Sequence, residues 1–393
     1  MSSGSDRAAD TPGPLAAAST GPLAAASTRP LAAASTRPLA AASTRPLAAV
    51  ALGGGHGLHA TLSALRLLAG RGVADPVTAV VTVADDGGSS GRLRRELGLL
   101  PPGDLRMALA ALAGDDVTGG GDRPAPGTPA AWVRLLQHRF GGRGALAGHA
   151  VGNLLLAGLT EVLGDPVAGL DAVAALVGAR GRVLPMSCEP LDIEAEVTGL
   201  DDDPRVAHRI RGQVAVASTP GRVRRVRLLP ARPRACPEAL AAVRAADVLL
   251  LGPGSWFTSV LPHLLVPELR EALVGAAARR VVVHNLEPEP GETAGFSPEQ
   301  HLAVLAEHAP ELRVDAVLAD VGSVAVPDRL RRAAAGLLAP GGAVHLAPVA
   351  AADPTTARHD PAALADALAA VLGRAAPAPP ARVDHSAAAG GVR

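Results

Sequence analysis

Short apolar runs alternate with stretches of helical periodicity along most of the chain. Residues 47–52 and 77–83 are apolar runs of strand length, and a helical pattern covers residues 58–69 between them. The same rhythm returns with apolar runs at 247–251 and 280–284. Strand, helix and strand joined by short links predict βαβ units with parallel strands. We therefore expect an α/β fold in which helices flank a mostly parallel sheet.

Between residues 188 and 230 the pattern changes to a period of two. From Leu191 to Val197, apolar residues alternate with acidic ones, which is typical of strands with one buried face. We expect a β-rich insertion at 188–230, inside one domain that spans residues 47–374.

The two ends of the chain differ from this domain in composition. The octapeptide PLAAASTR, or a close variant, occurs four times between Pro14 and Arg45. A period of eight is too short for a solenoid unit, and each copy contains a helix-breaking proline. We therefore expect disordered tails at residues 1–46 and 375–393. Just before the second tail, Asp360 predicts the N-cap of a last helix.

Composition excludes several classes of protein. Formal net charge is zero, so no overall field favours nucleic acid. The two cysteines, Cys188 and Cys236, form no C-x-x-C motif, which argues against a disulfide framework or a cysteine zinc site. No apolar stretch reaches the roughly 18 residues of a membrane span, and the N-terminus lacks a signal-sequence pattern. We expect a cytoplasmic protein with no membrane span and no nucleic-acid partner.

Four of the five residues after the first strand are glycine. Residues 53–57 read Gly-Gly-Gly-His-Gly and stand directly before the predicted helix. Glycines at this place let backbone N–H groups approach an anion at the helix N-terminus, which favours nucleotide or phosphate binding. The G-x-G-x-x-G pattern is broken because Leu58 stands at its third glycine. An ordinary tight turn is the structural alternative.

Two adjacent acids, Asp85 and Asp86, end the second strand. The sequence GGSSG at residues 87–91 predicts a flexible loop, and arginines follow. A dinucleotide fold places its ribose-binding acid at this point, and carboxylates also suit Mg²⁺ beside a phosphate. An Asp-Gly turn with a serine N-cap is the alternative. We expect Arg92 and Arg94 to offset the negative field of the acids near a diphosphate.

Two later strands end in loops of the same kind. Residues 252–255, Gly-Pro-Gly-Ser, follow the strand at 247–251, and Thr258 lies just beyond. Asn285 ends the strand at 280–284. In a parallel sheet all four loops lie at the carboxyl ends of strands, where open α/β sheets bind ligands. This convergence predicts an extended, phosphate-bearing ligand.

Several polar or aromatic residues near these loops are interpreted as structural. Asp104 is interpreted as the N-cap of a helix, and residues 297–300 predict a capping box. Trp256 is expected to fill the core. His56 and His284 are interpreted as histidines whose hydrogen bonds are satisfied within the protein, because no second metal ligand has suitable spacing.

Together these segments resemble the gluconeogenesis factor (YvcK-like) family of the CofD-like superfamily. The resemblance covers roughly residues 47–320, and DDGGSSGRLR at 85–94 is its most specific part. Further matching segments are LPPGD at 100–104, GNLLL at 152–156 and PGETAGF at 290–296.

The resemblance implies a Rossmann-like domain in a cytoplasmic protein needed for growth on gluconeogenic carbon sources, for cell shape and for cell-wall synthesis. It implies a UDP-sugar ligand, typically UDP-N-acetylglucosamine, and no established catalysis. A cell-wall regulatory protein partner is expected, and a homo-oligomer is left open.

The residues expected to bind the ligand belong to the four loops and to the GNLLL segment. They are Gly53, Gly54, Gly55, His56, Gly57, Asp85, Asp86, Gly87, Gly88, Ser89, Ser90, Arg94, Asn153, Gly252, Pro253, Gly254, Ser255, Thr258 and Asn285. Three positions depart from the family pattern. His56 replaces a threonine, Ala150-Val151 replace Asn-Phe, and residues 286–289 carry extra negative charge. Ligand choice is therefore expected to differ in detail.

Two other functions compete with the regulatory interpretation. In a CofD-like phospholactyl transferase that acts on a deazaflavin, Asp85 and Asp86 would hold Mg²⁺ against the donor's diphosphate. The long Gly-Gly-Ser-Ser-Gly-Arg segment favours the regulatory branch instead. An NAD-dependent oxidoreductase is disfavoured by the broken glycine pattern. Outside the transferase alternative, we assign no catalytic residue and no metal ligand.

Overall fold

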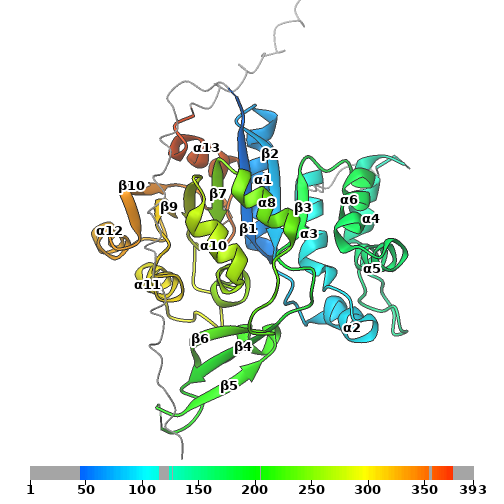
Figure 1. The fold of residues 1–393 in the computed structure, drawn as a ribbon, viewed down its shortest axis with the longest axis horizontal. Coiled ribbons are helices and arrows are strands. Elements are labelled where there is room, and N and C mark those ends of the chain that lie inside the picture. Colours follow the sequence, from blue (N-terminus) through cyan, green and yellow to red (C-terminus); the bar gives the residue numbers. More distant parts are fainter. Residues whose placement is uncertain (1–44, 115–123, 126, 204, 354–355, 375–393) are drawn as a thin grey trace, which may run out of the picture. The chain divides into compact units, whose positions relative to one another are not determined.

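A seven-stranded parallel sheet forms the centre of the chain (Figure 1). The computed structural model describes residues 45–114, 124–125, 127–203, 205–353 and 356–374. The helices and strands are β1 (Leu47–Gly53), α1 (Gly55–Gly70), β2 (Ala74–Val81), α2 (Gly88–Leu97), α3 (Pro102–Ala113), α4 (Pro129–Gln137), α5 (Val151–Leu163), α6 (Pro166–Val177), β3 (Arg182–Pro185), β4 (Asp192–Thr198), β5 (Ala207–Arg211), α7 (Gln213–Ala217), β6 (Arg222–Leu229), α8 (Pro237–Ala245), β7 (Val248–Leu251), the π-helix η2 (Trp256–Val260), α9 (Pro262–Leu265), α10 (Pro267–Gly275), β8 (Arg279–Val283), α11 (Pro298–His308), β9 (Val314–Asp320), α12 (Pro327–Ala334), β10 (Leu338–Ala347) and α13 (Pro361–Val371).

The strand order of the main sheet is β10-β9-β8-β7-β1-β2-β3, and every pairing in it is parallel. The central strands are almost wholly buried, as strands covered on both faces must be. The predicted α/β class with a mostly parallel sheet is therefore confirmed. The second strand runs from Ala74 to Val81, so it begins and ends earlier than the predicted 77–83.

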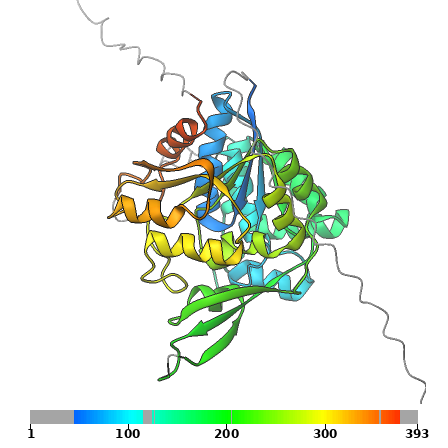
Figure 2. The ribbon, with the colours of Figure 1, turned by 60° about the vertical axis from the view of Figure 1, so that its left-hand side comes forward.

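Helices cover both faces of this sheet. Helices α1, α3 and α13 lie on one face, and α8 and α10 lie on the other (Figures 1 and 2). In α1, Leu58, Leu62 and Leu65 are buried at the spacing of one helical face. Helix α1 has Gly54 as its N-cap and starts at Gly55, three residues before the predicted start at residue 58.

The β-rich insertion predicted at 188–230 is a three-stranded antiparallel sheet of order β5-β4-β6. Ile193, Ala195 and Val197 of its central strand are buried, which confirms the period-two pattern. The acidic residues between them face arginines across the sheet, with Glu194 opposite both Arg211 and Arg227. Such cross-strand pairs of opposite charge stabilise a small sheet whose second face is polar.

The predicted tails lie almost wholly outside the described residues, which begin at residue 45 and end at residue 374. Their disorder stays a prediction. The last helix is as expected, since the carboxyl of Asp360 accepts the N–H of Ala363 at 2.7 Å. Among the residues that the structure describes, no helix combines the length and the apolar character that crossing a membrane requires.

Candidate functional site

Three of the four predicted loops contact one another directly. They follow β8, β7 and β1, which are neighbours in the sheet. A Cβ on Gly57 would lie only 2.2 Å from the carbonyl oxygen of Pro253, so the first and third loops approach as closely as glycine allows. Asn285 holds the third loop in place. Its side chain accepts the N–H of Gly254 and donates to the carbonyl of Gly254, both at 2.9 Å.

Two helices begin at this edge with a glycine as N-cap, which has no side chain that could cap its own helix. The N-caps of α1 and α2 are Gly54 and Gly87, and neither supplies a side-chain hydrogen bond to its helix. Elsewhere Thr128, Asp165 and Ser297 do cap their helices. The first N–H groups of a helix have no partner within the helix, so an uncapped N-terminus can bind an anion.

The prediction of a flexible loop at 87–91 was wrong. Helix α2 starts at Gly88, and Ser89, Ser90 and Gly91 belong to its first turn. The carboxyl of Asp85 accepts the N–H of Gly87 at 2.9 Å, which turns the chain into the helix. Serine and glycine at these positions therefore form a helix N-terminus.

Asp104 does not cap its own helix, which corrects the interpretation from the sequence. Helix α3 starts at Pro102 and has Pro101 as N-cap, so Asp104 lies within the first turn. Its carboxyl instead accepts the N–H of Gly55, the first residue of α1. Burial, and then the charge of Asp85, raise the pKa of Asp104 to about 7. Burial also raises the pKa of Asp85.

Positive charge surrounds the N-terminus of α1. His56 is exposed, so the interpretation of it as a satisfied structural histidine was wrong. Desolvation, and then the charges of Arg358, His59 and Arg106, lower the pKa of His56. Arg106 belongs to α3 and Arg358 to the segment after β10. The two arginines favour an anion at the point where α1 begins.

A chain of buried hydrogen bonds connects the first turn of α2 to α3 and α5. Asn153 accepts a hydrogen bond from Arg106 Nε at 2.9 Å and donates to Ser89 Oγ at 3.0 Å. Ser89 Oγ lies 2.9 Å from Nδ1 of His149, whose pKa is lowered by burial. Ser89 and Asn153 are 3% and 1% exposed, so they position the helix from within the protein.

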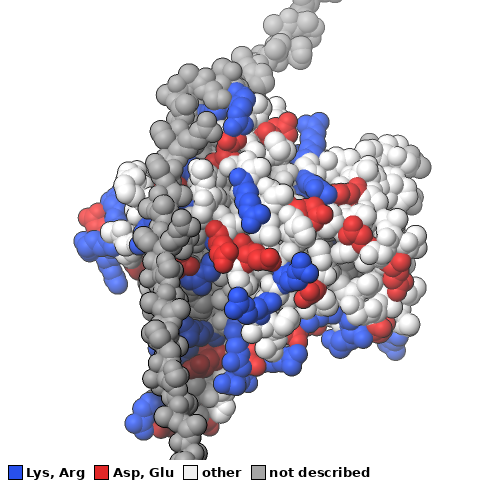
Figure 3. Space-filling model, in the orientation of Figure 1, with Lys and Arg blue, Asp and Glu red and all other residues white. Residues whose placement is uncertain are grey.

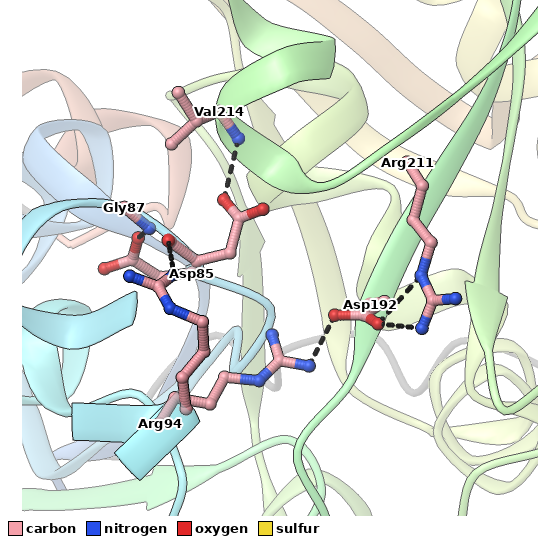
Figure 4. A network of polar contacts seen from close by, with 8 residues as sticks. Asp85, Gly87, Arg94, Asp192, Arg211 and Val214 are labelled. Carbon is pink, nitrogen blue, oxygen red and sulfur yellow. Dashed lines mark hydrogen bonds and ion pairs between the residues drawn. The ribbon is translucent and has the colours of Figure 1, made fainter. Parts of the chain in front are cut away.

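Asp86 and Arg94 connect α2 and its leading turn to the insertion (Figure 4). Asp86 Oδ1 accepts the N–H of Val214 in α7 at 2.9 Å. Arg94 donates to Asp192 of β4 at 2.5 Å, and Asp192 also pairs with Arg211. Arg94 is therefore engaged within the protein, beside its predicted role near a diphosphate. Arg92 likewise donates to the carbonyl oxygen of Ala147 at 2.7 Å.

Below the third loop, most of the expected structural residues are confirmed. Trp256 is fully buried, and its indole N–H donates to the carbonyl of His301 at 2.9 Å. The two ring nitrogens of His284 lie 2.9 and 3.0 Å from backbone carbonyl oxygens. Thr258 is fully buried beside Glu292, whose pKa burial raises to about 7. Thr258 therefore lies beneath the loop, away from its exposed surface.

Two surface hollows of about 410 and 440 Å³ lie away from this edge. Both are formed between the three-stranded sheet and α11, and both include Glu196, Arg225 and Glu307 in their lining. On the face shown in Figure 3, arginine and acidic side chains are interspersed instead of gathered by sign.

Four residues of this edge were missed or misread from the sequence. Asp104 was visible in the LPPGD segment, and Arg106 follows it by two positions. His149 and Arg358 carry no local motif, and only the folding of distant segments brings them to α2 and α1. Ser89, Asn153 and Thr258, which were predicted to bind the ligand, are buried beneath the edge. The ligand-binding role of all the predicted residues stays a prediction.

Comparison with known proteins agrees with the fold. A family model described as "2-phospho-L-lactate transferase CofD" matches residues 49–338, so the class of protein is CofD-like. X-ray structures of a Bacillus halodurans protein, described in one case as a member of the UPF0052 family, are similar with TM-scores of 0.66 and 0.69. They are 33% and 32% identical, and they cover 82% and 84% of this chain and 98% and 99% of the other.

Curated relatives narrow the class further. A "Putative gluconeogenesis factor" of Mycobacterium tuberculosis (strain ATCC 25618 / H37Rv) is 58% identical over 328 residues, or 83% of this chain and 90% of the relative. A "Gluconeogenesis factor" of Bacillus subtilis (strain 168) is 38% identical over 282 residues, or 71% of this chain and 80% of the relative. The chain belongs to the gluconeogenesis factor family of CofD-like proteins.

Proposed function

We propose that the chain is a cytoplasmic regulatory protein that binds a nucleotide sugar, with UDP-N-acetylglucosamine as the first candidate ligand. The ligand binds at the carboxyl edge of β8, β7, β1 and β2. Through a protein partner that senses the bound state, the chain supports growth on gluconeogenic carbon sources, normal cell shape and cell-wall synthesis.

One observation carries this proposal: helices α1 and α2 start at the same sheet edge, and the N-cap of each is a glycine without a side chain. The Asp104 carboxyl engages only the N–H of Gly55 in α1. Two helix N-termini provide two sets of N–H donors, which suits the two phosphates of a nucleoside diphosphate. Arg358 and Arg106 add positive charge beside α1, near His56. At Gly55 no other protein group lies within 4 Å of the place of a Cβ, so a phosphate can approach the backbone there.

A ligand screen by thermal shift tests the proposal. A ligand that binds only the native state raises its stability, by about 2.7 kcal/mol at a concentration one hundred times Kd. We expect UDP-N-acetylglucosamine to raise Tm more than GDP, NAD or UDP alone. A larger shift with NAD, or no shift with any nucleotide sugar, would contradict the assignment.

The transferase is the second candidate, and the pairing of Asp85 with Asp104 favours it. The charge of Asp85 raises the pKa of Asp104, so these carboxyls are close neighbours. A Mg²⁺ ion fits such a pair, because hard cations take carboxylate oxygens. Bound there, it would neutralise the repulsion between the two acids and the negative charge of a donor's diphosphate. Stronger stabilisation by GDP together with a deazaflavin and Mg²⁺ would support this function over the first.

A further inference from the structure

The only two cysteines of the chain lie against each other, although 47 residues separate them in the sequence. Cys188 follows β3 at the start of the insertion, and Cys236 is the N-cap residue of α8 just after the insertion ends. The backbone N–H of Cys236 donates to the carbonyl oxygen of Met186 at 3.1 Å. The two cysteines therefore join the entry and the exit of the insertion.

The two thiols have different surroundings. Cys188 is exposed and Cys236 is buried. The hydrogen bond between the two side chains lowers the pKa of Cys188 and, together with burial, raises the pKa of Cys236. The single thiol proton of Cys236 is shared with Glu238 Oε2, which lies 3.2 Å from Sγ. An exposed thiol with a lowered pKa reacts with oxidants faster than a buried one.

We propose that Cys188 and Cys236 form an oxidation site, in which hydroperoxides react with Cys188 and Cys236 then closes a disulfide across the base of the insertion. In the first step the Cys188 thiolate attacks one oxygen of hydrogen peroxide, the O–O bond breaks, and with one proton the products are a sulfenic acid and water. In the second step the sulfur of Cys236 displaces the sulfenic oxygen as water. The Cys236 proton leaves through the neighbouring Glu238 carboxylate and is carried off by that water. Overall, two thiols and one peroxide give one disulfide and two waters.

The position of the pair gives the disulfide a mechanical consequence. Residues 189–235, which contain the three-stranded sheet, become a closed covalent loop. The same segment contacts the ligand edge, because Val214 donates to Asp86 and Asp192 pairs with Arg94. Oxidation therefore restrains the part of the chain that is attached to α2.

Peroxide treatment of the full-length reduced protein tests the chemistry. We expect intact mass spectrometry to show the loss of two hydrogen atoms, peptide mapping to link Cys188 to Cys236, and dithiothreitol to reverse both changes. In Cys236→Ser, Cys188 should accumulate as a sulfenic acid that dimedone traps. Cys188 is exposed, so Cys188→Ser should fold normally. In this variant Cys236 should remain a free thiol after peroxide treatment.

Two measurements use the wild-type protein only, so they do not depend on whether the variants fold. In the reduced protein, iodoacetamide should modify Cys188 at least about tenfold faster than Cys236, because only the first thiol is exposed. In the oxidised protein, amide hydrogen exchange over residues 192–229 should be slower than in the reduced protein. Retention of both thiols after peroxide, or linkage only between two chains, would overturn the oxidation site. Unchanged exchange would overturn its restraint of the insertion.

Discussion

At the scale of single residues, Asp104 belongs to α3 but accepts a hydrogen bond from α1. It lies in the first turn of α3 and accepts the first N–H of α1. Its folded-state pKa of about 7 stands above the ordinary 3.8. Between these two pH values the folded protein keeps a proton that the unfolded chain has lost. This group therefore makes the protein less stable as pH rises through that window.

The first prediction follows from this loss of stability with rising pH. Asp104→Asn cannot ionise but still accepts the N–H of Gly55, so it should be more stable than the wild type at pH 8, with Tm higher by roughly 2 °C. Near pH 4 the two proteins should melt alike. Thermal melts across this range provide the check, with Asp328→Asn on the exposed face of α12 as control. A difference that does not change with pH would disprove the raised pKa.

Asp86 supports a second prediction at the same scale. Asp86→Asn keeps an acceptor for the N–H of Val214, so the fold should be preserved. If Asp86 also holds a hydroxyl of the ligand, its loss should weaken binding of UDP-N-acetylglucosamine by roughly 1–3 kcal/mol. Calorimetric titration measures this, again beside Asp328→Asn. Unchanged affinity together with a large loss of stability would mean that Asp86 only anchors α7.

At the scale of elements, α2 is held from several directions. Its first turn rests on Asn153 of α5 through Ser89, and Arg94 near its end pairs with Asp192 of β4. Neither contact is local in sequence. The insertion and α5 together therefore orient the N-terminus that is proposed to meet the ligand.

Removal of one of these contacts gives the third prediction. The side chains of Arg94 and Asp192 are only 15% and 22% exposed, so Arg94→Ala should lower the free energy of unfolding by about 1–3 kcal/mol. Arg331→Ala breaks an exposed pair within α12 and should cost less than about 0.5 kcal/mol. Urea unfolding of both variants compares them. Equal losses would show that the contact between α2 and the insertion adds no stability.

At the scale of the whole molecule, the described fold begins with an ion pair at residue 45. Arg45 donates to both carboxylate oxygens of Asp247 at 2.7 and 2.8 Å, and Asp247 also accepts the N–H of Ala48. Arg45 is the last residue of the fourth octapeptide copy, and the rest of the repeat precedes it. We therefore expect residues from Arg45 onward to contribute to the stability of the fold, and residues 1–44 to contribute little.

Deletion of residues 1–44 tests this division. The repeat has few large apolar side chains to bury, so the deletion should leave Tm within about 1 °C and ligand affinity unchanged. A deletion that also removes Arg45 should cost up to about 1 kcal/mol, the scale of an exposed ion pair. A fall of several degrees in the shorter deletion would show that the repeat packs on the domain.

By itself the sequence determined the α/β class, the insertion at 188–230 and the edge where the loops meet. Apolar period and the order of strand, loop and helix are local properties, and parallel strands all end at the same edge. The tertiary structure alone decided which polar groups face one another. Asp104 meets α1 because α3 packs against α1. Arg94 meets β4 because the insertion folds back to α2. Such contacts join residues far apart in the chain, so no local pattern could predict them.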